Sequence, residues 1–128
     1  ALPVTFQNNQ LLHFNYIDRR SSKFSSDLID LIKYRIVSEV LLIDWFNEGK
    51  LNKFNNNIIK SFFDKTIPLI LFGGINNSKQ IDNLLLNKNV SAISIGNFLS
   101  YSETAIQKIK SQLDLNLVRP PYYEKKVV

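Results

Sequence analysis

Four glycines form the clearest chemical pattern in this sequence. Gly49, Gly73, Gly74 and Gly96 are its only glycines among 128 residues, and each follows a short apolar segment typical of a β-strand. Glycine lets a backbone approach a ligand closely, and backbone N–H groups near a helix N-terminus bind anions. Any one of these glycines could also serve only as a turn residue. Their recurrence after three successive strands favours a phosphate site made by these glycines.

Two carboxylates lie close to this glycine pattern and are the candidate catalytic residues. Asp44 ends an apolar segment, and Glu48 follows four residues later. A carboxylate placed beside a ligand can act as a general acid or base. Asp44 could point toward such a ligand, or it could face solvent or cap the following loop, and both alternatives remain open at this stage. We expect His13, the single histidine, to be a surface or packing residue.

The residue composition argues against metal and cofactor chemistry of the common kinds. The chain has no cysteine and one histidine, so thiolate and multi-histidine metal sites are excluded. We expect neither a metal nor a cofactor.

The elements that must position these residues follow an alternating pattern of strand and helix. The expected strands cover 2–6, 11–17, 39–44, 68–72 and 90–95. The expected helices cover 25–36, 58–63, 76–85 and 102–113. Strands that alternate with helices predict a parallel sheet with helical crossovers. We therefore expect an α/β fold over residues 1–117, followed by an extended tail over 118–128.

Charge and hydrophobicity indicate an ordinary globular chain. The formal net charge is +5, but the basic residues are scattered and form no stripe of the kind that binds nucleic acid. Apolar runs are too short to span a membrane, and no segment has the pattern of a signal peptide. With no cysteine to oxidise, we expect a cytoplasmic protein that binds neither nucleic acid nor membranes.

Several motifs resemble one known family. The segments EVLL at 39–42 followed by Gly49, PLILFGG at 68–74 and VSAISIGNF at 90–98 are similar to three successive strands and loops of that family. The segment 11–16 resembles a small hairpin that the family also carries. The family is the cyclase subunit of imidazole glycerol phosphate synthase, a histidine-biosynthesis (β/α)₈ barrel. The resemblance, to the second half of that barrel, implies that the glycines and Asn97 hold one phosphate of a bisphosphorylated ribonucleotide.

The departures from the family concern its side chains. The family has a catalytic Asp at the end of a strand that corresponds to residues 3–8, where this sequence has no carboxylate. Gln7 or Asn8 can form hydrogen bonds there but cannot shuttle a proton at neutral pH. Phe46 replaces a loop acid, Glu48 fills the position of another, and Phe72 replaces a serine before Gly73. The resemblance therefore implies a phosphate site kept in the backbone and impaired catalysis.

The length of the chain leads to two alternative functions. A (β/α)₈ barrel needs about 250 residues, and this chain supplies four βα units, half of a TIM-type barrel. Such a half leaves two parallel edge strands unpaired, so we expect it to assemble as a homodimer or with a complementary half-barrel chain. It would bind a phosphorylated small molecule or inorganic phosphate. The alternative is an active cyclase or lyase of histidine biosynthesis, or a cyclase-like subunit of an ammonia-transferring sugar amidotransferase system. The ammonia-conducting role would need a glutaminase partner.

Overall fold

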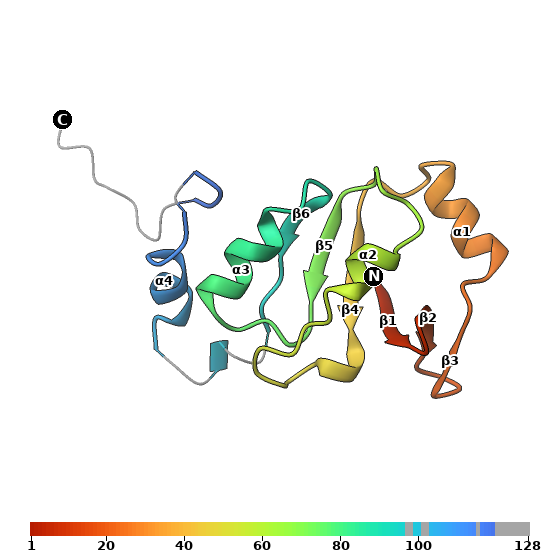
Figure 1. Cartoon of the computed structure of the whole chain (residues 1–128), viewed down its shortest axis with the longest axis horizontal. Coiled ribbons are helices and arrows are strands. Elements are labelled where there is room, and N and C mark those ends of the chain that lie inside the picture. The colour runs from red at the N-terminus through yellow and green to blue at the C-terminus, as the bar shows by residue number, and fades with distance from the viewer. Residues whose placement is uncertain (97–98, 101–102, 115, 120–128) are drawn as a thin grey trace.

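A computed structural model of the chain describes residues 1–96, 99–100, 103–114 and 116–119. They form a mixed α/β domain around a six-stranded sheet (Figure 1). Its strands are β1 (Leu2–Gln7), β2 (Gln10–Asn15), β3 (Arg20–Ser22), β4 (Val40–Asp44), β5 (Leu69–Phe72) and β6 (Val90–Ile93). The helices among the described residues are α1 (Ser26–Lys33), α2 (Asn57–Ser61), α3 (Ser78–Leu85) and α4 (Ala105–Lys110), with a 3₁₀ helix, η1 (Trp45–Asn47). Asn97 and residues 120–128 of the expected tail lie outside the described residues.

Four strands of the sheet run parallel to one another, as the alternation of strand and helix predicts. The sheet order is β3-β2-β1-β4-β5-β6, and the pairs β1–β4, β4–β5 and β5–β6 are parallel. One row across these strands joins Leu2 to Leu42, Leu42 to Leu71 and Leu71 to Ile93. The expected α/β class is therefore confirmed.

The other two strands extend the sheet beyond β1 and correct one expectation. Asn8 and Asn9 have φ of 49° and 58°, which suits a two-residue hairpin turn between β1 and β2. β2 pairs antiparallel with β1, and β3 pairs antiparallel with β2. We expected both outer parallel strands to be unpaired, but the hairpin strand already covers the edge of β1. In the described part of the chain, only β6 remains as an open parallel edge.

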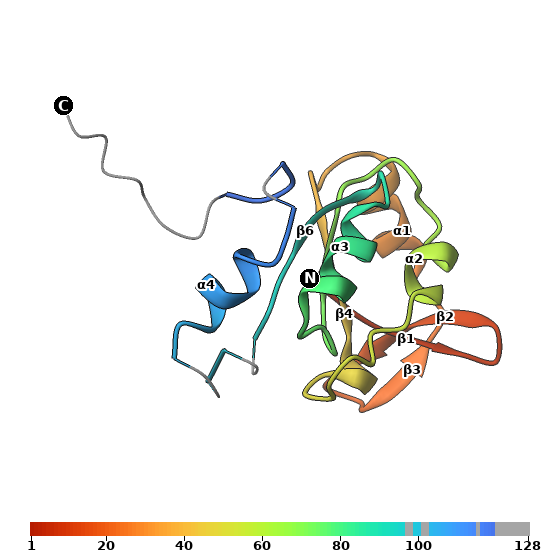
Figure 2. The same ribbon diagram turned by 60° about the vertical axis from the view of Figure 1, so that its left-hand side comes forward.

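Three helices cover one face of the sheet. Figures 1 and 2 show α1, α2 and α3 on that face, whereas α4 lies beyond the edge formed by β6. Alternate strand residues point into the layer between sheet and helices, because side chains alternate along a strand. The core residues there include Val4, Ile32, Val40, Leu42, Ile58, Leu69, Leu71, Ile81 and Leu84.

The two longest helices begin within two residues of their expected starts. The side chain of Ser25 accepts a hydrogen bond from the Leu28 N–H at the start of α1, and Asn77 accepts one from the Gln80 N–H at the start of α3. Such caps satisfy N–H groups that have no partner within the helix.

Three helices are shorter than expected. α1 stops at Lys33 because Arg35 has a left-handed φ of 57°, so Ile36 is 69% exposed and does not lie on the inner face. α2 stops at Ser61, so Phe62 and Phe63 lie beyond it, although Phe62 is still buried in the core. The last helix, expected over 102–113, covers Ala105–Lys110 among the described residues, and Ser102 lies outside them.

Candidate functional site

Asp44 lies at the carboxyl end of β4 and points toward the helical layer. It alternates with Ile43 along the strand and is 1% exposed. Its Oδ2 atom accepts hydrogen bonds from the Asn55 backbone N–H at 2.9 Å and from Asn47 Nδ2 at 2.8 Å. The structure therefore places the Asp44 carboxylate as a cap for the loop between β4 and α2, the second of the two alternatives drawn from the sequence.

Burial controls the protonation of this carboxyl group. Loss of solvation raises the pKa of Asp44, while hydrogen bonds from Asn47 and Asn55 and the positive charge of Lys50 act in the opposite direction. A general acid or base must reach the proton that it transfers. Asp44 is instead surrounded by its own loop, so its clearest role here is structural.

The other residues predicted in this loop lie on its surface. Glu48 is exposed, and its charge adds to burial in raising the pKa of Tyr16. Gly49 is also exposed and has a φ of 76° that favours glycine. Lys50 Nζ lies 3.8 Å from the centre of the Phe46 ring, a cation–π contact. Glu48 and Gly49 are therefore accessible to a ligand, whereas Asp44 is not.

Gly73 and Gly74 are buried where the chain after β5 contacts the loop after β4. A Cβ atom at Gly73 would lie 2.6 Å from the Asp44 carbonyl oxygen, and one at Gly74 would lie 2.7 Å from the Phe54 nitrogen. The Gly74 carbonyl also accepts hydrogen bonds from the N–H groups of Lys53 and Phe54, at 2.9 and 3.3 Å. The absence of side chains at Gly73 and Gly74 therefore allows close packing against the loop after β4 of the same chain.

Gly96 follows β6 and contacts the side chain of Phe72. A Cβ atom at Gly96 would lie 2.9 Å from a carbon of the Phe72 ring. This phenyl ring stands where the resembled family has a serine, and it uses the space that the missing Gly96 side chain leaves. The structure thus brings Gly73, Gly74 and Gly96 to the carboxyl edge of the sheet, which is formed by the carboxyl ends of the parallel strands.

A polar pocket nearby contains residues that the sequence interpretation did not select. It has a volume of about 340 Å³ and lies between the loop after β4 and helix α3. Its polar lining residues are Asn52, Asn56, Asn77, Lys79, Gln80 and Asn83. Asn77 Nδ2 donates a hydrogen bond to Asn52 Oδ1, which ties the two loops together. The dense asparagine clusters at 55–57 and 76–77 were the signal that could have indicated it.

Aromatic residues fill the space beside η1. The rings of Phe14 and Trp45 stack with their centres 3.8 Å apart, and Tyr16 meets Phe14 edge-on at 5.2 Å. Phe14 is on the strand face opposite to His13, which lies 6.2 Å from the Phe24 ring on the helical side. Trp45 therefore packs against the hairpin.

The described residues contain neither a metal-binding cluster nor a membrane-spanning helix. No three His, Asp or Glu side chains in that part of the chain gather closely enough to hold a metal ion. No helix there is both long and apolar enough to cross a bilayer.

Comparison with known proteins adds no family to this description. No protein-family model matches the sequence, and a search of curated proteins found no significant match.

Proposed function

We propose that this chain is an assembly module, half of a barrel-like structure, and that a second copy covers the sheet face left uncovered by its helices. The observation that carries the proposal is a set of apolar side chains on that face. Leu41, Ile43, Ile70 and Phe72 alternate with the buried residues of β4 and β5 and are partly exposed. Register pairs Leu41 with Ile70 and Ile43 with Phe72, so they form one contiguous patch, here called the open face.

Physical chemistry supports a partner on the open face. Parallel sheets occur almost only where both faces are covered, because their strands are apolar on both sides. Here α1, α2 and α3 occupy the opposite face (Figure 2). A contiguous apolar patch in water favours association, and a two-fold axis would bury the same patch on both copies. The hairpin on β1 means that such a pair can extend the parallel sheet only at β6.

A charge placed on the open face tests this proposal. Ile70→Asp should convert a dimer to a monomer in sedimentation velocity, since two aspartates would be buried in the interface. Leu86→Asp is the matched control, because Leu86 is 74% exposed at the end of α3, on the helical side. Circular dichroism must show that both variants stay folded. Equal masses for the folded variants and the unmodified chain would refute the open face as the interface.

We also propose that the carboxyl edge of the sheet binds a phosphate group. Supporting this are Gly73 and Gly74 at the end of β5, the start of α3 four residues later, and Lys79 beside the polar pocket. The N-terminus of a helix favours an anion. The family resemblance suggests a phosphorylated small molecule as the ligand, and the enzymatic alternative would use the same edge.

The phosphate proposal calls for a variant that leaves the glycines intact. Replacing Gly74 would disturb its contact with Phe54, so a lost ligand response could reflect damaged packing. Lys79→Gln removes a positive charge from the pocket, and Lys60→Gln removes one from α2 as a control. Phosphate should raise the melting temperature of the unmodified chain and of Lys60→Gln, but raise that of Lys79→Gln much less. No shift at millimolar phosphate in any of them would refute phosphate binding.

A further inference from the structure

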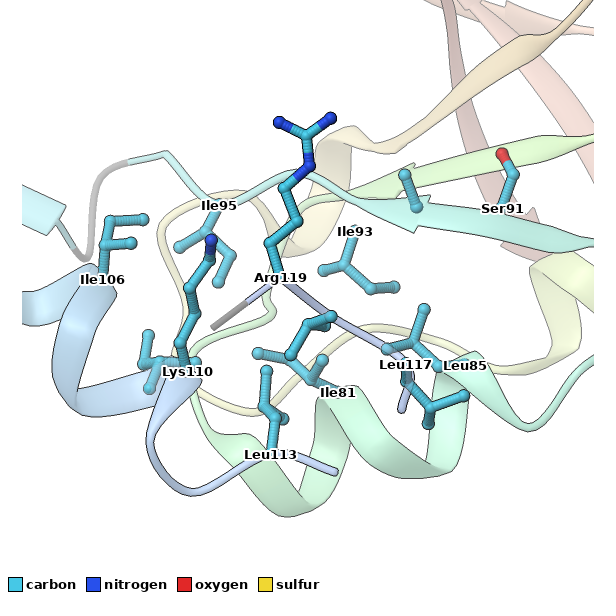
Figure 3. Close-up of a pocket in the computed structure, with 13 residues that line it drawn as sticks. Ile81, Leu85, Ser91, Ile93, Ile95, Ile106, Lys110, Leu113, Leu117 and Arg119 are labelled. Carbon is cyan, nitrogen blue, oxygen red and sulfur yellow. The ribbon is translucent and has the colours of Figure 1, made fainter. Parts of the chain in front are cut away.

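An apolar pocket lies between β6, α3 and α4, at the opposite end of the sheet from the hairpin. Its volume is about 580 Å³ (Figure 3). Its walls come from three elements and the segment after α4, and their large apolar residues include Ile81, Leu85, Ile93, Ile95 and Ile106. Pockets of about 300–1,000 Å³ with apolar walls and a few convergent polar groups are the usual form of small-molecule sites.

The charged residues of this pocket are all of one sign. Lys110 and Arg119 line it, and no acidic residue does. In Figure 3 the Lys110 side chain ends beside Ile95, and the Arg119 side chain extends upward beyond it. Within the described residues, neither has a carboxylate partner. The described residues of the pocket therefore combine an apolar interior with a rim that carries two positive charges and no acidic lining residue.

We propose that this pocket binds an amphiphilic anion, a single acyl chain whose carboxylate lies between Lys110 and Arg119. The apolar walls suit the chain, because burying methylene groups is favourable. The two cations suit the head group, because charge-assisted hydrogen bonds to a carboxylate are strong. A cationic or uncharged amphiphile would leave both positive charges without compensation. The site lies at the β6–α4 end of the sheet, and none of the four open-face residues lines it.

Calorimetric titration of the whole chain with monomeric dodecanoate tests the proposal. We expect saturable binding of one dodecanoate per chain, and binding of dodecyltrimethylammonium at least tenfold weaker. The double variant Lys110→Gln, Arg119→Gln should bind dodecanoate at least tenfold more weakly than the unmodified chain. The control double variant Lys60→Gln, Lys88→Gln removes the same charge elsewhere and should bind as the unmodified chain does.

A second variant separates the pocket from a general effect of net charge. Ile106 is 41% exposed and lines the pocket on α4, so Ile106→Glu should fold normally and introduce a repelling carboxylate. It should weaken dodecanoate binding at least tenfold with an unchanged circular dichroism spectrum.

Three results would overturn the proposal. The first is absence of saturable dodecanoate binding. This result counts against the proposal also if light scattering shows that the chain is a dimer and that dodecanoate does not dissociate it. The second is equal dodecanoate affinity in the unmodified chain and the Lys110/Arg119 double variant. The third is binding to vesicles of anionic phospholipid without binding of monomeric dodecanoate, which would assign the two cations to a membrane surface.

Discussion

The Asp44 carboxylate accepts a 2.9 Å hydrogen bond from the backbone N–H of Asn55, and so ties the end of β4 to the segment just before α2. The same oxygen accepts a second hydrogen bond from Asn47. A buried donor left without its acceptor destabilises a fold. We therefore predict that Asp44→Ala lowers the free energy of unfolding by roughly 1–3 kcal/mol, measured by urea denaturation. Asp18→Ala, on the exposed segment after β2, is the control and should change it far less.

The pH dependence of stability should reveal opposite contributions from two aspartates. Burial raises the pKa of Asp44 above its ordinary value of 3.8, so its contribution is full below about pH 4 and is lost as the pH rises through the folded-state pKa. Hydrogen bonding from Arg35 lowers the pKa of Asp64 well below its ordinary value of 3.8, so its contribution is full above about pH 4 and is lost as the pH falls. The Arg35–Asp64 ion pair is 2.8 Å long.

Two conservative variants measure these contributions. Asp44→Asn should remove a decline in stability as the pH rises above 4, and Asp64→Asn should remove a decline as the pH falls below 4. Denaturation curves between pH 3 and pH 7 for both variants and the unmodified chain provide the comparison. Parallel curves for all three proteins would contradict these assignments.

Gly74 should be far less tolerant of a side chain than Gly49, although both have left-handed φ, of 71° and 76°. A Cβ atom at Gly74 would lie 2.7 Å from the Phe54 nitrogen, whereas Gly49 is exposed. We predict a loss of about 1 kcal/mol for Gly49→Ala, from backbone strain alone. Gly74→Ala adds overpacking, for a total loss of roughly 2–4 kcal/mol. Similar losses in the two variants would show that the loop relaxes away from Gly74.

The isolated chain should not cyclise the bisphosphorylated substrate of the resembled family at an enzymatic rate. General acid–base catalysis typically contributes about 10²–10⁴-fold. Residues 3–8 supply no carboxylate. Asp44, at the end of the neighbouring strand β4, is 1% exposed, and its carboxylate caps its own loop. Substrate consumption with excess ammonium salt is the assay. Turnover that disappears in Asp44→Asn would contradict this account and identify Asp44 as a catalytic residue.

Features that depend on neighbouring residues could be predicted from the sequence. Ser25 and Asn77 cap helices because each accepts a hydrogen bond from an N–H three residues later. The turn at Asn8 and Asn9 could also be predicted, since asparagine tolerates the left-handed conformation. The parallel arrangement of four strands followed from the alternation of strand and helix.

Features that depend on distant residues could not be predicted in the same way. β3 consists of Arg20, Ser21 and Ser22, which have no apolar alternation and form a strand only because β2 pairs with them. The role of Asp44 depends on Asn55, and the requirement for Gly74 depends on Phe54, twenty positions earlier in the chain. For this reason the sequence predicted that the glycines follow strands, but not which segments of the chain pack against them.

The mass of the unmodified chain in solution tests the central claim, assembly through the open face, most directly. Light scattering coupled to size-exclusion chromatography, at several concentrations in the micromolar range, gives that mass without labels. Leu41, Ile43, Ile70 and Phe72 form an apolar patch on the sheet face opposite to α1, α2 and α3. We therefore predict twice the monomer mass or a multiple of it. A folded monomer at every concentration would contradict the proposal.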